Sequence, residues 1–225
     1  MTDLKIPRGK CHTGLPEGHK KIDKHLLKSL INSELYFARP ARLNDPFDCR
    51  VNIINALENA IHRSLPPVRQ RLEKIRKMKS FFDKVQTDLE GMGVSSFSLD
   101  LENPIMWSHY ADNHRGICLA YSFPESFFYE AADYILGIAS VDYGLDPLSN
   151  WFLREASGLG SFDEFGMSLI QKILTIKAEQ WEYENEVRII KNTGGVYPID
   201  KKYLKQVCFG LATPETDVQL IKKAF

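Results

Sequence analysis

The sequence lacks two features that would place it at a membrane or on a polyanion. No apolar stretch approaches the ~18 residues of a membrane-spanning helix, and the first ten residues hold charges and Pro7 instead of the apolar core of a signal peptide. An excess of one charge is also missing, because 29 Lys and Arg balance 29 Asp and Glu. We therefore expect a cytoplasmic protein without membrane contact, whose contacts with any polyanion are local.

Several signatures of known chemistry are also absent. The four cysteines include no CxxC pair, which excludes a dense disulfide framework, and their spacing to nearby histidines matches no common zinc finger, so no metal site is predicted. The chain has no Walker loop, GxGxxG, GxSxG or HExxH motif. P-loop phosphoryl transfer, α/β-hydrolase chemistry and zincin-type proteolysis are therefore disfavoured.

The length of 225 residues, 44% of them hydrophobic, permits one elaborated domain or two small ones, and we favour a single domain over 1–225. Periodicity and capping signals alternate irregularly between helix and strand. This pattern predicts the α+β class, with a mixed or mainly antiparallel central sheet and flanking helices. The predicted helices are a short one capped by Asp23 and those at 64–89, 103–111 and 214–223, with a helical region at 147–180 that is broken by Gly158, Gly160 and Gly166. The predicted strands are 35–37, 94–99, 116–123, 138–143, 184–191, 196–199 and 206–210.

Three dense polar and aromatic clusters are candidates for function. The first is Asn44-Asp45-Pro46-Phe47, in a turn. The second is 106–112, with the sequence MWSHYAD, and the third is 181–188, with the sequence WEYENEVR. Each lies at the edge of a predicted element and cannot serve one continuous apolar core. We therefore predict that the three clusters meet around one pocket.

The second cluster suggests proton transfer. On a helix, Trp107 and Tyr110 share one face, while His109 and Asp112 lie three residues apart and are close enough to hydrogen-bond. A histidine oriented by a carboxylate suits general acid and base catalysis. The alternative is that the histidine only braces the adjoining turn at 113–116.

The third cluster reads as a strand with Glu182, Glu184, Glu186 and Arg188 on one face. If that face meets solvent, the charges protect an edge strand against pairing. If it lines a pocket, a carboxylate there is suited to bind a ribose hydroxyl or to steady an oxocarbenium cation. Trp181 and Tyr183 would then form aromatic walls.

A basic stripe runs along the segment from Arg69 to Lys79. We predict a helix whose cations face water, because Val68, Leu72 and Ile75 occupy its inward side. The stripe is either ordinary solvated surface or a contact for the phosphates of a nucleic acid. Its cations are Arg69, Arg71, Lys74, Arg76, Lys77 and Lys79.

Taken together, the three clusters resemble a large bacterial family of unknown function, DUF2971. Besides the clusters, the resemblance rests on the SSFS sequence at 95–98, on Gly116, on Lys177 and on a late Gly210. Members often occur near anti-phage loci. The resemblance therefore implies a defence or toxin role, with an antitoxin or a neighbouring defence protein as a partner, but it implies no particular reaction.

The chain also resembles the ADP-ribosyltransferases, whose site combines an early His or Arg, a middle-strand Ser or Tyr and a late Glu. His12, Ser96 or Ser98, and the pair Glu184 and Glu186 occur here in that order. The resemblance implies an NAD co-substrate with its ribose held by His12. Glu186 would be the catalytic carboxylate, and Glu184 would orient the acceptor.

Our first hypothesis is a defence-type enzyme that transfers ADP-ribose from NAD to a macromolecule such as nucleic acid. The candidate catalytic residues are Glu186, Glu184, His12 and His109; the candidate binding residues are Asn44, Asp45, Phe47, Ser96, Ser98, Trp107, Tyr110, Trp181 and Arg188. One alternative is a metal-dependent nuclease that uses Asp45, Asp48, His109, Asp112, Glu184 and Glu186. Another is a non-catalytic sensor or interaction module.

Overall fold

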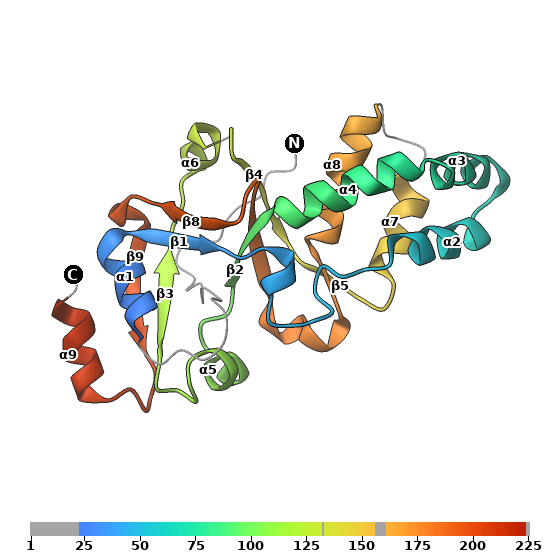
Figure 1. Ribbon diagram of the computed structural model, residues 1–225. Coiled ribbons are helices and arrows are strands. Elements are labelled where there is room, and N and C mark those ends of the chain that lie inside the picture. The colour runs from blue at the N-terminus through green and yellow to red at the C-terminus, as the bar shows by residue number, and fades with distance from the viewer. Residues whose placement is uncertain (1–22, 132, 156–160, 224–225) are drawn as a thin grey trace. The chain divides into compact units, whose positions relative to one another are not determined.

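The computed structural model describes residues 23–131, 133–155 and 161–223 and has an α+β fold, as the sequence predicts (Figure 1). Its internal contacts group into two compact units, each built from separate stretches of chain. The first unit comprises the described parts of 1–38, 93–140 and 183–225, and the second comprises those of 39–92 and 141–182. Whether 1–225 behaves as one domain stays a prediction.

The first unit holds three small antiparallel sheets. Strand β1 (Glu34–Phe37) pairs with β8 (Gly195–Pro198), and β3 (Ile117–Tyr121) pairs with β9 (Leu204–Phe209). In the third sheet β7 (Glu186–Lys191) lies between β2 (Gly93–Ser98) and β4 (Ile135–Ser140). All these pairings are antiparallel, which agrees with the predicted mainly antiparallel sheet.

An aromatic core stabilises this unit. Side chains alternate across a strand, so Phe97 of β2 and Ile189 of β7 point into the same buried cluster as Phe37 and Phe123. Phe97 packs edge-on against Phe123, with ring centroids 6.2 Å apart. The opposite face of the β2–β7 pair carries the other set of side chains, in which the paired Ser96 and Arg188 and the paired Ser98 and Glu186 are polar. The helices of this unit are α1 (Lys24–Asn32), α5 (Pro104–Tyr110), α6 (Glu125–Glu130), α9 (Glu215–Lys223) and the 3-10 helix η3 (Lys201–Tyr203).

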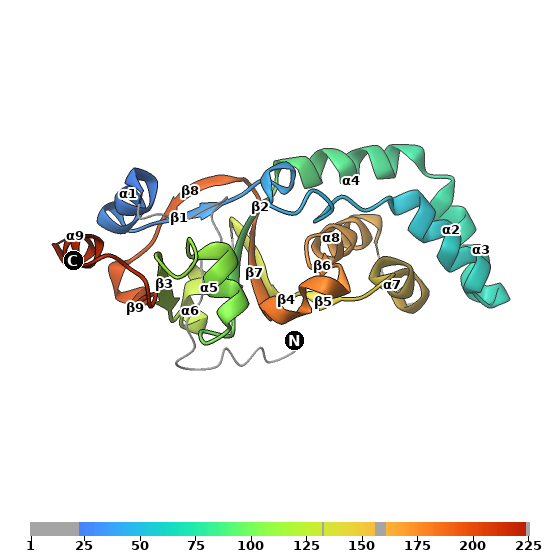
Figure 2. The same cartoon turned by 90° about the horizontal axis from the view of Figure 1, so that it is seen from below.

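The second unit is mainly helical. Helix α2 (Ile53–Arg63) packs against α3 (Pro66–Arg76) and α7 (Pro147–Glu155), and α4 (Lys79–Gly91) packs against α8 (Phe162–Ile173), as Figures 1 and 2 show. A short parallel pair joins β5 (Asp142–Tyr143) to β6 (Ile176–Lys177). The chain first enters this unit at residue 39, just before the 3-10 helix η1 (Pro40–Arg42). It finally leaves the unit after residue 182, within the 3-10 helix η2 (Glu179–Glu184).

Several expectations about the elements were wrong, including the end of the helical region expected to reach residue 180, which stops at Ile173 before strand β6. The single helix expected over 64–89 is two helices, because the backbone leaves helical geometry at Met78, whose φ and ψ are −91° and 73°. The strand expected from Glu184 begins at Glu186, since the preceding residues form η2. Helix α2 was not predicted, although Asn52 caps it by accepting a hydrogen bond from the Asn55 amide at 2.9 Å.

Other local signals were read correctly. The Asp23 carboxylate caps α1 by accepting hydrogen bonds from the amides of His25 and Leu26. The six cations of the basic stripe are all exposed, while Leu72 and Ile75 are buried, as predicted. The helix that carries the stripe ends at Arg76, so Lys77 and Lys79 lie beyond it. Within the described ranges no helix has the length and apolar character to cross a membrane.

Candidate active site

Helix α5 brings the second cluster onto the third. Asn103 caps α5 by accepting from the Ile105 amide at 2.9 Å, and its side-chain nitrogen donates to the Tyr183 carbonyl at 2.7 Å. Pro104 occupies the first turn, where its missing N–H costs nothing. One residue therefore both starts the helix and fixes it to the segment that carries Glu184.

The Tyr110 hydroxyl donates a hydrogen bond of 2.6 Å to Glu184 Oε1. Glu184 has no exposed surface, and Tyr110 is half-buried. Burial, followed by the Glu184 charge, raises the pKa of Tyr110 far above its ordinary value. Tyr110 therefore remains protonated near neutral pH and donates its proton to this buried carboxylate.

His109, the residue before Tyr110, is exposed. Its Nδ1 is 3.2 Å from the Tyr183 hydroxyl, and the two rings pack edge-on. The hydrogen bond anticipated between His109 and Asp112 is not formed. Helix α5 ends at Tyr110, and Asp112 takes a left-handed backbone conformation with φ of 47°. The exposed His109 is therefore paired with a tyrosine, Tyr183, and not with a carboxylate.

A left-handed turn fixes the end of α5. Asp112, Asn113 and His114 have φ values of 47°, 53° and 66°, in a region that Asn, Asp and His tolerate better than most residues. The His114 ring stacks on Trp107 at 6.3 Å, and its Nε2 is 3.3 Å from Ser108 Oγ. The bracing histidine of this turn is therefore His114, not His109.

Gly210 makes this turn possible. A Cβ at position 210 would lie 2.1 Å from the His114 carbonyl oxygen, a distance that only glycine avoids. The same carbonyl accepts from the Ala212 amide at 2.9 Å. The late glycine of the sequence pattern thus supports the second cluster from β9's end.

The polar face of the β2–β7 pair holds four of the predicted site residues. Ser98 is directly opposite Glu186, and Ser96 is opposite Arg188. Glu186 Oε1 and Oε2 accept from Arg188 Nε at 2.8 Å and Nη2 at 3.0 Å, a two-pronged ion pair. All four side chains are buried. Burying such charges is costly, so the arrangement needs a reason other than hydrophobic packing.

This geometry corrects the solvent-exposed interpretation of the third cluster. β7 is the central strand of its sheet, and Glu186 and Arg188 are at most 2% exposed, so the charges do not protect an edge. The predicted row of four is also wrong, because Glu182 is exposed on η2 and Asn185, with φ of 45°, separates Glu184 from the strand.

The first cluster forms a structured turn in the second unit. Asp45 accepts a hydrogen bond from the Phe47 amide at 2.9 Å, the usual use of Asp in a turn. Phe47 is 81% exposed, and Asn44 is exposed as well. Because the other clusters lie mainly in the first unit, the convergence of all three on one pocket stays a prediction.

The second unit contains a buried ion pair that the sequence reasoning did not foresee. Lys177 Nζ lies 3.9 Å from Asp48 Oδ2, and both side chains are about 5% exposed or less. The same Nζ lies 5.0 Å from the centre of the Trp181 ring, which gives Trp181 a cation–π contact. Cys49 Sγ contacts Asp48 at 3.3 Å. Lys177 was noted only as part of a family pattern, because an isolated lysine carries no local signal of burial.

The structure does not test the role predicted for His12, and it adds nothing in favour of a metal-dependent nuclease. His12 lies outside the described residues. Within the described ranges no three His, Cys, Asp or Glu side chains gather as metal ligands, so the nuclease alternative gains no support from them.

Two tyrosines, the buried Tyr121 and the half-buried Tyr110, predict a fall in stability at alkaline pH. Burial raises the pKa of Tyr121 to about 12 and also raises that of Tyr110. Their stabilising effect is complete below about pH 10, the unfolded value, and is lost as the pH rises toward the folded values. Free energies of unfolding from urea titrations should show this fall above about pH 10. An equally steep fall in the Tyr110→Phe/Tyr121→Phe variant would contradict the assignment.

The structure defines an α+β protein whose first unit holds two buried carboxylates, Glu184 bonded to Tyr110 and Glu186 paired with Arg188. Residues 106–189 match the model of a family described as "Protein of unknown function (DUF2971)". The family resemblance drawn from the sequence motifs is thereby confirmed over that segment. None of the curated proteins and none of the solved structures gives a match. The resemblance to ADP-ribosyltransferases stays a prediction.

Proposed function

We propose that this protein is a cytoplasmic defence or toxin enzyme that transfers ADP-ribose from NAD to a macromolecule such as nucleic acid. The observation that carries the proposal is the pairing of Ser98 with Glu186 across β2 and β7. The ADP-ribosyltransferase resemblance combines a middle-strand Ser or Tyr with a late Glu, and here Ser98 and Glu186 are directly opposite each other.

The Glu186 carboxylate provides a negative charge in a fixed position. In the proposed reaction the bond between ribose C1′ and the nicotinamide nitrogen breaks, and its electron pair leaves with nicotinamide. The positive charge that develops on the ribose would lie beside Glu186, which Arg188 holds in one orientation. Ser96 and Ser98 supply hydroxyl groups to the same face.

The contacts of Glu184 and His109 are suited to binding and activating the acceptor. The acceptor nucleophile forms the new bond to C1′ and must lose a proton. We assign Glu184, held by Tyr110, to orienting that nucleophile and the exposed His109 to taking its proton. Trp107 braces the end of α5 and is a positioning residue in this scheme.

Isothermal calorimetry with NAD on the full-length protein tests the proposal directly. We expect saturable NAD binding and slow release of nicotinamide, detected by chromatography, even without an acceptor because water can substitute. Neither binding nor release under conditions in which the protein is folded would refute the transferase proposal and favour a non-catalytic module. Hydrolysis of nucleic acid that depends on a divalent metal would instead support the nuclease alternative.

A further inference from the structure

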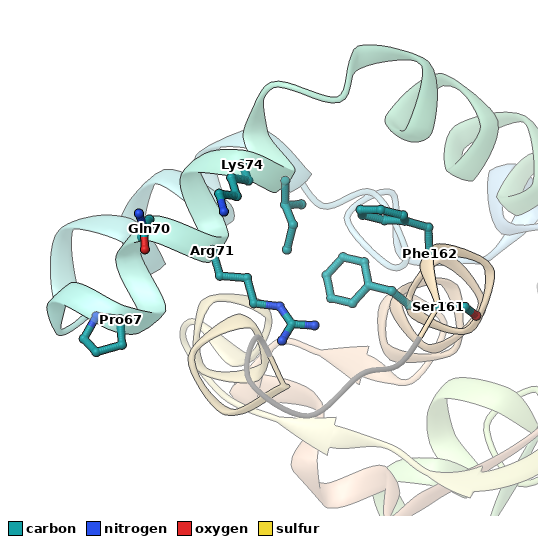
Figure 3. Close-up of a pocket in the computed structure, with 8 residues that line it drawn as sticks. Pro67, Gln70, Arg71, Lys74, Ser161 and Phe162 are labelled. Carbon is teal, nitrogen blue, oxygen red and sulfur yellow. The ribbon is translucent and has the colours of Figure 1, made fainter.

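A pocket of about 330 Å³ lies between α3 and the start of α8 in the second unit (Figure 3). Gln70, Arg71 and Lys74 line it from α3, and Ser161 and Phe162 line it from the N-terminal end of α8. Lys74 follows residues 70 and 71 by four and three positions, so all three lie on one side of α3. The pocket therefore combines cationic, amide and aromatic groups, and it belongs to neither carboxylate site described above.

Two of the cations of α3 have partners within the second unit. Arg69 donates to the Ser64 carbonyl at 2.8 Å, and Arg76 forms an ion pair with Glu58 at 3.4 Å, so both act within the helical bundle. Lys74, by contrast, is exposed and has no ion-pair partner among the residues that the structure describes. Lys74 is one of the residues that line the pocket, and its ammonium group is suited to bind an anion from solution.

The facing wall offers an exposed aromatic ring. Phe162 is 57% exposed, although it belongs to the first turn of α8. Its ring contacts Phe81 at 6.3 Å, and Phe81 in turn stacks on the buried Phe165 at 5.6 Å. This support holds the Phe162 ring in place while leaving surface open to solvent. A supported, accessible ring is suited to base stacking, and the cations that line the same pocket are suited to phosphates.

We propose that the α3–α8 pocket binds single-stranded nucleic acid, with a base on Phe162 and the adjoining phosphates at Lys74 and Arg71. Gln70 and Ser161 supply polar groups for the edge of the base. The volume suits one nucleotide, not a duplex, whose bases are already stacked and inaccessible to the ring. The inference rests on the proposed function only in making this strand the acceptor of ADP-ribose; the binding itself needs no NAD.

Fluorescence anisotropy with a labelled mixed-sequence single-stranded oligonucleotide tests the proposal on the full-length protein without NAD. We expect Lys74→Glu to weaken binding about tenfold and to reduce the salt dependence by about one charge. The matched control is Lys28→Glu on α1, an exposed lysine with the same charge change, which should alter binding less than about twofold. Phe162→Ala should also weaken binding about tenfold, whereas Phe162→Trp, which retains a ring, should preserve it.

Three results would overturn the proposal: no binding at low salt, equal losses from Lys74→Glu and Lys28→Glu, or tighter binding of a duplex of the same sequence. Thermal melting of each variant identifies losses that arise from unfolding, and Phe162→Trp keeps the test decisive if Phe162→Ala does not fold. Because NAD is absent, failure here leaves the transferase proposal standing. Failure of the NAD experiment likewise leaves strand binding intact.

Discussion

Arg188→Met should lower the free energy of unfolding by about 3–5 kcal/mol, because it leaves the Glu186 carboxylate buried without its guanidinium. This is the largest stability effect that we expect from a single substitution in the first unit. The long methionine side chain fills much of the arginine volume, so the loss reports the missing charge more than a cavity. Urea denaturation of the wild type and the variant measures it.

A double-mutant cycle separates the ion pair from other contacts of the two residues. Glu186→Gln alone should also destabilise, since it leaves Arg188 buried beside a neutral amide. The Glu186→Gln/Arg188→Met variant should lose less than the sum of the single losses, because neither partner is then left as an uncompensated charge. Additive losses would show that the two charges do not stabilise each other.

Lys28→Met is the matched control for this cycle. It removes a cation of similar length from the exposed surface of α1 and should change the free energy of unfolding by no more than about 0.5 kcal/mol. A comparable loss at Lys28 would mean that charge removal in general, and not the buried pair, destabilises the protein.

The sequence predicted elements whose signals are local. Asn103 followed by Pro104 predicts the start of α5, and the alternation after Gly93 predicts β2, because both depend only on neighbouring residues. The break at Met78 carries no glycine or proline, so the two helices α3 and α4 read as one. The helix ends there through a change of backbone geometry that the residue types do not predict.

The candidate site was predictable in its residues but not in its arrangement. Tyr110 and Glu184 belong to separate clusters and lie 74 positions apart in the sequence. No local pattern in either cluster predicts that the two residues contact each other. Whether the charged side chains of the third cluster are buried depends on the position of β7 in its sheet. That position is set by its pairing with β2 and β4. A period of two fixes which side chains share a face, but not whether that face meets solvent.

Glu184→Gln and Glu186→Gln should separate the two halves of the proposed reaction, which is the largest functional effect that we expect. Loss of the Glu186 charge should lower both NAD hydrolysis and ADP-ribosyl transfer by about 100-fold or more, because both pass through the same cationic ribose. Loss of the Glu184 charge should lower transfer by a similar factor yet leave hydrolysis within about threefold, since water needs less orientation than a macromolecular acceptor. Nicotinamide release and label transfer from radioactive NAD measure the two rates.

Tyr110→Phe extends this test without removing a charge. It takes away the hydroxyl that donates to Glu184 and should reproduce the Glu184→Gln pattern more weakly, with transfer reduced about tenfold and hydrolysis preserved. The ratio of transfer to hydrolysis is insensitive to partial unfolding, because both rates scale with the amount of folded enzyme. Equal losses of both activities in Glu184→Gln would therefore refute the assignment of Glu184 to the acceptor. Full activity in both glutamine variants would remove the buried carboxylates from catalysis and move the search to His109 and Asp45.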